Sequence, residues 1–290
     1  MNKVIIVIFC DEGFGDQYAS FVTAYNVIPK IKNLGFDIKI FISKEHKYFS
    51  LKTPLSVIYN LSIFDCEVEE LRWGSIKEKL KDYKLISFSA IQIYVKNNED
   101  ILKDFCYDNI TRYNLHNLTE NPLLIENFYN NEIIDISNNF ISNKNKLAVL
   151  HFRSGDAFWR SSLEDVKKDG FWGNQFEKSY NFIESHKDYD VMICSSNRQV
   201  VDHFCEKYSN AFKNEFSDNS LNMHRLYGHD FNEDDRRYIE HSKEILGEMI
   251  SISHAQKAYS INHFSSNFIL YGILNNINYS IFRDKIINLI

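Results

Sequence analysis

The stretch Leu147-Ala148-Val149-Leu150-His151-Phe152-Arg153-Ser154-Gly155-Asp156 is an apolar run with an abrupt polar ending. A continuous apolar run is typical of a strand that is buried on both faces of a parallel α/β sheet. Ligands bind such sheets outside the carboxyl ends of the strands, which is where His151, Arg153 and Asp156 fall. An arginine there offers phosphate a planar fork of donors and always keeps its charge. The stretch therefore predicts an anion site at a strand end of an α/β fold.

Composition sets the outer limits of this interpretation. The chain has 290 residues, of which 44% are hydrophobic and 25% charged, and this is long enough for two domains of ordinary size. A net charge of −6 argues against a broad nucleic-acid surface, so we expect no nucleic-acid partner and only a local anion site. No apolar run reaches the roughly 18 residues that cross a bilayer. The run Lys3–Phe9 leads into Asp11-Glu12 rather than a small-residue cleavage site, which favours a first strand over a signal peptide.

Cysteines and acidic residues give no sign of a metal site. Five cysteines are scattered without a Cys-x-x-Cys pair, which indicates a reducing compartment and no structural zinc. Packing is the expected role of Cys10, Cys194 and Cys205. The carboxylates at 188–190 and 230–235 do not follow a calcium-loop pattern and are predicted to be solvated. We therefore expect no metal and no cofactor.

The first half of the chain begins with a βαβ pattern. Val4–Phe9 predicts a buried strand, and Asp16 is a candidate N-cap of a helix that runs to about Asn33 and ends at Gly35. Pro29 is expected to break this helix or split its last turn. Further strands are predicted at 37–42 and 83–89, the stretch 51–70 is ambiguous, and 97–145 is mainly helical in pattern.

The second half repeats the α/β pattern more clearly. A polar connector at 143–146 places a domain boundary between a lobe of residues 1–143 and a lobe of residues 144–290. The second lobe is predicted to have strands at 147–151, 190–194 and 257–262, with helices at 172–186, 199–208, 234–253 and 265–275. Ser195-Ser196-Asn197 is expected to form a turn and a helix cap. The predicted architecture is two Rossmann-like lobes with a central cleft.

Two further stretches are candidate binding loops. Gly13-Phe14-Gly15-Asp16 lies between a strand and a helix, where glycines allow a ligand close to the backbone. It is an incomplete Gly-x-Gly-x-x-Gly, and a tight turn without a ligand explains it equally well. Ser265-Ser266-Asn267 also joins a strand to a helix, where hydroxyls and free amides could cradle phosphate. Simple N-capping by Ser266 is the alternative for this stretch.

Arg153 is the residue predicted to bind a diphosphate group. His151 and Arg153 alternate on one strand end and so point to the same side. A guanidinium at this place could neutralise a diphosphate as it leaves, which is often the largest catalytic contribution. The alternative is a structural ion pair between Arg153 and Asp156, which would contribute little.

These motifs, in this order, resemble the α1,6-fucosyltransferases, both the NodZ-like nodulation branch and the animal core-fucosylating branch, and the related protein O-fucosyltransferases. Gly13–Asp16 resembles the early Gly-Phe-Gly-Asp loop, and His151–Asp156 the His-x-Arg-x-x-Asp motif. Asp190–Asn197 is similar to the strand and turn that end in Thr-Asp-Asp or Thr-Asp-Ser. His263–Ser266 is similar to the late Thr-Phe-Ser-Ser motif, and Glu248 falls near the acidic position upstream of it.

The resemblance implies a GT-B glycosyltransferase whose second lobe holds a GDP-sugar. Arg153 would bind the β-phosphate, His151 and Glu248 would lie near the guanine, and Ser265 and Ser266 would contact phosphate. It also implies inverting transfer in one displacement without a metal. The predicted substrate-binding residues are Gly13, Phe14, Gly15, His151, Ser154, Ser195, Ser196, Asn197, Glu248, Phe264, Ser265, Ser266 and Asn267.

The sequence also departs from that family. Ser154 stands where the animal branch has a second arginine, and Ser196 and Asn197 stand in place of the paired acids. These differences leave the donor sugar open between fucose and another GDP-linked sugar. The general base is open as well, with Asp16, Asp156 and Glu164 as candidates beside the catalytic Arg153.

We therefore expect a cytoplasmic glycosyltransferase, at most peripheral to the inner face of the membrane, that transfers fucose or a related sugar from a GDP donor. The acceptor would be a glycan or lipid-linked glycan hydroxyl in surface polysaccharide synthesis. Two alternatives remain: a nucleotide-binding protein on the same scaffold without catalysis, and an α/β enzyme of another class such as a dehydrogenase.

Overall fold

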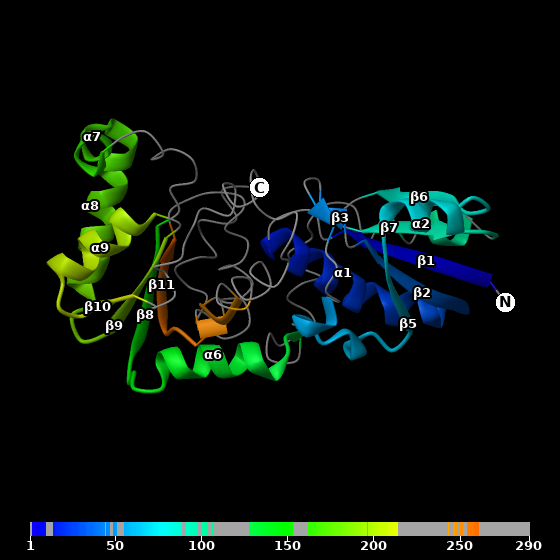
Figure 1. Ribbon diagram of the computed structural model, residues 1–290, viewed down its shortest axis with the longest axis horizontal. Coiled ribbons are helices and arrows are strands. Elements are labelled where there is room, and N and C mark those ends of the chain that lie inside the picture. The colour runs from blue at the N-terminus through cyan, green and yellow to red at the C-terminus, as the bar shows by residue number, and fades with distance from the viewer. Residues whose placement is uncertain are drawn as a thin grey trace. The chain divides into compact units, whose positions relative to one another are not determined.

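The computed structural model describes two compact units, which meet in the sequence between Asn131 and Glu132. Each unit is built on its own β-sheet (Figure 1). The residues described are 2–9, 14–43, 45–46, 49–50, 55–88, 91–97, 100–103, 106, 128–152, 162–195, 197–213, 243, 246–248, 250–251 and 254–260.

The first unit has a five-stranded sheet in the order β5-β2-β1-β7-β6. The strands β1, β2 and β5 are mutually parallel, whereas β7 is antiparallel to both β1 and β6. A separate two-stranded ladder joins β3 and β4. The elements are β1 Asn2–Phe9, α1 Phe14–Asn33, β2 Phe36–Ser43, β3 Glu45–His46, β4 Phe49–Ser50, the short 3₁₀ turns Leu55–Val57 and Leu61–Ile63, β5 Glu67–Leu71, α2 Trp73–Lys79, β6 Lys84–Phe88 and β7 Gln92–Val95.

Two predictions about α1 are wrong. The helix begins at Phe14, so Asp16 lies in its first turn and is not the N-cap. Pro29 lies inside the helix without ending it, although a proline removes one backbone bond and costs about 3 kcal/mol. Ile28 and Ile31 beside it are buried, and packing of this kind stabilises helices more than propensity does. Gly35 ends the helix as predicted, with a φ of 84° that favours glycine.

The strands predicted in the first half are confirmed by β1, β2 and β6. The ambiguous stretch 51–70 contains the two 3₁₀ turns and most of β5. The sequence pattern missed α2 and β7. Both are short, with seven and four residues, and neither spans enough of a period to be distinguished from a loop.

The second unit has a four-stranded sheet in the order β10-β9-β8-β11, with every pair parallel. The predicted strands 147–151 and 190–194 are confirmed residue for residue, and the predicted helices 172–186 and 199–208 correspond to α8 and α9. The elements are α6 Asn131–Ile141, β8 Leu147–His151, α7 Leu163–Lys168, α8 Gly170–Ser185, β9 Asp190–Cys194, α9 Arg198–Lys207, β10 Ala211–Phe212 and β11 Lys257–Ser260.

Strand β8 is buried on both faces, as its apolar run predicts. Ala148 and Leu150 face one core cluster, together with Phe152 and side chains of α8 and α9. Leu147 and Val149 face the other cluster, together with Met192 and Cys194. Alternation along the strand produces this division, because successive side chains point to opposite faces.

The described part of the predicted helix 234–253 packs on α6. Its described residues 243, 246–248 and 250–251 are helical. Lys243 donates to the carboxylate of Glu132 over 2.9 and 3.0 Å, and the buried hydroxyls of Ser137 and Ser251 lie 2.9 Å apart. The predicted strand 257–262 corresponds to β11 up to Ser260. The predicted helix 265–275 lies outside the described residues.

Candidate functional site

The carboxyl ends of three parallel strands meet in the second unit. In the sheet register His151 at the end of β8 is paired with Cys194 of β9 on one side and with Ser260 of β11 on the other. The N–H of Phe152 donates to the carbonyl of Cys194 over 2.8 Å and extends this ladder by one residue. His151 therefore occupies the middle of the edge where α/β sheets bind ligands.

Cys194 links this edge to a distant part of the chain. Its side chain is buried, and the thiol forms a hydrogen bond with the carboxylate of Glu248. Burial, together with the nearby negative charge of Glu248, raises the pKa of the Cys194 thiol well above 9.0. The thiol thus stays protonated at neutral pH and donates to the carboxylate. Cys194 is the common neighbour of His151 and Glu248, the two residues that the resemblance places near the guanine.

Ser195 and Asn197 form the turn that follows β9. The hydroxyl of Ser195 accepts from the N–H of Asn197 over 3.1 Å. The side chain of Asn197 caps α9 and accepts from the N–H of Gln199 over 2.9 Å, which confirms the predicted cap. Both residues are half-buried, and these two hydrogen bonds hold the shape of the turn that follows the carboxyl end of β9. We name His151, Cys194, Ser195, Asn197 and Glu248 together the carboxyl edge.

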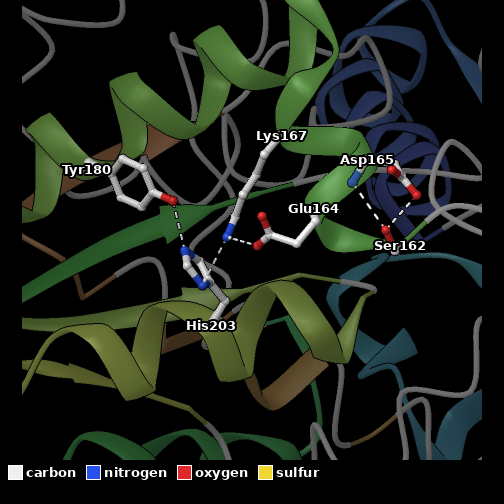
Figure 2. Close-up of polar contacts among 6 residues, drawn as sticks. All are labelled: Ser162, Glu164, Asp165, Lys167, Tyr180 and His203. Atoms are coloured by element: carbon white, nitrogen blue, oxygen red, sulfur yellow. Dashed lines mark hydrogen bonds and ion pairs between the residues drawn. The ribbon is translucent and has the colours of Figure 1, made fainter.

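Glu164 belongs to a different set of contacts. It lies on α7, its side chain is 73% exposed, and it pairs with Lys167 over 3.1 Å. Ser162 caps this helix by accepting from the N–H of Asp165 (Figure 2). Lys167 in turn approaches His203 of α9. As a general-base candidate Glu164 is therefore exposed and paired with a lysine, and its catalytic role stays a prediction.

Other predicted site residues are described in part or not at all. The backbone of Phe14, Gly15 and Asp16 forms the start of α1, directly in the first helical turn. Acidic residues are favourable there because of the helix dipole. Nine predicted residues lie outside the described ones, and their roles stay predictions: Gly13, Arg153, Ser154, Asp156, Ser196, Phe264, Ser265, Ser266 and Asn267.

The described cysteines are free thiols, namely Cys66, Cys106, Cys194 and Cys205. Cys194 and Cys205 pack in the second-unit core, which confirms the role expected of them. Burial raises the pKa of the Cys205 thiol to about 11. Within the described part of the chain, no group of three or more His, Cys, Asp or Glu residues could hold a metal ion.

Sequence reasoning assigned Cys194 to packing and missed its bond to Glu248. The available signal was its position at a strand end, but only the fold brings position 248 to it. The polar contacts among α7, α8 and α9 were missed as well, because their residues belong to three separate elements.

The two sheets define a two-lobed α/β protein of the Rossmann-like class. In its second sheet, polar side chains suited to ligand binding lie at the carboxyl end of β8. No family model matches the chain, and no curated protein matches it. In the ranges that the structure describes, no helix is long and apolar enough to cross a membrane.

Solved structures identify the fold more closely. The chain is similar to NodZ α-1,6-fucosyltransferase soaked with GDP-fucose, with 13% identity, a TM-score of 0.51, and coverage of 95% of this chain and 94% of that one. It is similar to fucosyltransferase NodZ from Bradyrhizobium at 14% identity and a TM-score of 0.51, covering 97% and 96% of the two chains. The selenomethionine form of that protein gives a TM-score of 0.53 at 14% identity. The resemblance to NodZ is thus confirmed at the level of the fold.

Proposed function

We propose that the chain is a glycosyltransferase that takes fucose or a related sugar from a GDP donor and attaches it to a glycan hydroxyl. The observation that carries this proposal is the fold, which matches NodZ over nearly the whole of both chains. The matched structures include NodZ soaked with GDP-fucose and NodZ co-crystallised with GDP.

The carboxyl edge supports a nucleotide site in the second unit. His151 and Glu248 share Cys194 as a neighbour, and Ser195 and Asn197 follow in the adjoining turn. A carboxylate is a bidentate acceptor, and the Watson–Crick edge of guanine offers two adjacent N–H donors. Glu248 is therefore a candidate reader of guanine, held in place by the Cys194 thiol.

The proposed chemistry is the departure of GDP from the sugar. Arg153 follows His151 by two residues and would neutralise the diphosphate as it leaves, with help from the hydroxyls of Ser265 and Ser266. A general base must take the proton of the acceptor hydroxyl, and Asp156, Glu164 and Asp16 are the candidates. The reaction as proposed inverts the anomeric centre and needs no metal.

The proposed setting is the cytoplasm, at most peripheral to the inner face of the membrane. A glycan or lipid-linked glycan in surface polysaccharide synthesis would be the acceptor. This part of the proposal rests on composition and on the family resemblance alone.

Ligand binding tests the donor class first. Thermal shifts with GDP, UDP, CMP and NAD should rank GDP highest. A ligand at one hundred times its Kd adds about 2.7 kcal/mol to the free energy of unfolding, which moves the melting temperature visibly. Stabilisation by NAD but not by GDP would overturn the proposal in favour of an oxidoreductase.

Replacement of the arginine tests the mechanism. Arg153→Ala should lower sugar transfer at least about 100-fold and weaken GDP binding, because one side chain serves both the bound and the departing diphosphate. Arg72→Ala is the matched control, since Arg72 is an exposed arginine at the start of α2 in the first unit. Equal kinetics for the two variants would contradict the role of Arg153.

A binding protein without catalysis is the second candidate. Asn197 stands where the family has an acid, and its side chain is engaged in capping α9. If GDP-sugars bind tightly but are neither transferred nor hydrolysed across a panel of acceptors, this second function is the correct one.

A further inference from the structure

Three helices of the second unit meet at a polar cluster centred on His203. The ring of His203 on α9 lies 2.8 Å from the Tyr180 hydroxyl of α8 through Nε2, and 3.5 Å from Lys167 Nζ of α7 through Nδ1. Lys167 also donates to Glu164 over 3.1 Å. Figure 2 shows the imidazole between the tyrosine and the lysine. We name Glu164, Lys167, Tyr180 and His203 the latch cluster.

The contacts favour one protonation state of the imidazole. A lysine ammonium only donates, so Nδ1 of His203 must accept with its lone pair. The ring proton then resides on Nε2 and is donated to the Tyr180 oxygen. The cluster thus favours a neutral His203, because a proton added at Nδ1 would face the Lys167 ammonium.

The surrounding charges act in both directions. Burial of the His203 ring, followed by the positive charges of Lys167 and Lys207, lowers its pKa below 6.5, whereas Glu164 and Glu206 act the other way. On α8, Tyr180 is flanked by Glu177, and the Lys207 ammonium lies 3.6 Å from the Tyr180 ring centroid. The acidic groups lie on exposed positions, so solvent screens them more than the half-buried Lys167.

The latch cluster joins α7, the shortest α-helix that the structure describes in this unit, to α8 and α9. Helix α7 has six residues, and Val166 is the one buried apolar side chain among them. Lys167 supplies the polar tie to α9 and also lies over the ring of Phe176 in α8. In the sequence α7 follows residues 153–161, which contain Arg153 and Asp156.

We propose that His203 is an acid-sensitive latch, which ties α7 to α9 while the imidazole is neutral and releases α7 when Nδ1 is protonated. Protonation converts the acceptor into a donor that faces another cation, so the contact becomes repulsive. More of the partly buried ring meets solvent when α7 opens, so protonation at Nδ1 costs less in the open state. The inference does not depend on the proposed glycosyl transfer.

The lowered pKa of His203 determines how the opening of α7 depends on pH. A histidine whose pKa is lower in the closed state than its ordinary 6.5 binds its proton preferentially when α7 is open. The closed state is therefore fully favoured above pH 6.5 and is weakened as the pH falls below it. One proton at a pH one unit below 6.5 changes the opening equilibrium by at most about tenfold.

Hydrogen exchange of the intact chain tests the latch. Protection factors, corrected for the pH dependence of intrinsic exchange, should fall severalfold for the amides of 163–168 between about pH 7.5 and pH 5.5. His203→Gln keeps an acceptor and a donor but cannot titrate, so its protection in α7 should not change with pH. His186→Gln removes a histidine at the opposite end of α8 and should keep the wild-type response.

A second measurement uses the ring itself. The imidazole pKa of His203, followed by NMR in the intact protein, should rise toward 6.5 in Lys167→Met because the facing ammonium is removed. This result requires only that the Lys167→Met variant folds. An α7 protection that is equal at both pH values in the wild type, an equal fall in His203→Gln, or an unchanged imidazole pKa in Lys167→Met would each overturn the latch.

Discussion

At the scale of single residues, Gly173 has a role that helix propensity alone does not indicate. It lies in α8, where a Cβ would come within 2.5 Å of the backbone carbonyl oxygen of Lys167 in α7. An alanine in a helix is normally worth up to about 1 kcal/mol more than a glycine. Here the collision is with backbone, which cannot turn aside as a side chain can.

Gly173→Ala should therefore lower the free energy of unfolding by about 1–3 kcal/mol, the usual cost of overpacking. Gly170→Ala in the same helix is the control, because a Cβ at Gly170 meets nothing within 4 Å. That variant should be as stable as the wild type or slightly more stable. Denaturant midpoints compare the two, and equal stability would show that α7 simply shifts.

Glu248 gives a second prediction at this scale, on the basis of the proposed donor. Glu248→Gln keeps the shape but replaces one acceptor oxygen with a donor, so it should weaken GDP binding about tenfold or more. Binding of UDP should change much less, since uracil lacks the two adjacent donors of guanine. Calorimetric titration of both nucleotides tests this, and an equal loss for GDP and UDP would place Glu248 away from the base.

At the scale of elements, α6 packs closely against the helical residues 243, 246–248 and 250–251 because Gly247 has no side chain. A Cβ at Gly247 would lie 2.5 Å from Cγ2 of Ile136 on α6. The buried hydroxyl pair of Ser137 and Ser251 and the ion pair of Lys243 with Glu132 flank this contact. The interface therefore depends on the combined volume of the side chains at 136 and 247.

A double-mutant cycle tests that dependence. Gly247→Ala should cost about 1–3 kcal/mol in the wild-type background. Ile136→Ala removes Cγ2, so adding Gly247→Ala to it should cost at least about 0.5 kcal/mol less. Additive effects of the two changes would mean that the helices separate freely.

Some helices and strands could be predicted from the sequence and others could not. Strands β8 and β9 were predictable because a strand buried on both faces is a continuous apolar run in the sequence. The cap at Asn197 was predictable because capping involves only neighbouring residues. The continuity of α1 through Pro29 was not predictable, because packing of the buried Ile28 and Ile31 outweighs local propensity there. The bond of Cys194 to Glu248 was beyond reach because only tertiary structure joins those positions.

At the scale of the whole molecule, the two units differ in how their strands run. All described strands of the second sheet are parallel, so their carboxyl ends gather at one edge, whereas in the first sheet β7 runs opposite to its neighbours β1 and β6. The described residues of the carboxyl edge all belong to the second unit. This arrangement supports the proposal that the second unit holds the donor.

GDP should accordingly protect the two units unequally. Saturating GDP should slow amide exchange most at 150–152 and 194–199, where β8 and β9 end, because bound ligand suppresses local opening. The buried amides of β2 in the first unit serve as the internal control. Uniform protection of both units would indicate general stabilisation instead of a donor site on the second sheet.

Asp169 joins α7 directly to α8. Its N–H bonds to the carbonyl of Val166 and so closes α7, while its carboxylate accepts from the N–H groups of Phe171 and Trp172 and so opens α8. Asp169 thus makes the last hydrogen bond of α7 and the first hydrogen bonds of α8, and no further residue separates the two helices. An insertion or deletion here would separate the two sets of bonds and destabilise both helices. Relatives of the chain should therefore keep a constant number of residues between the caps at 162 and 169.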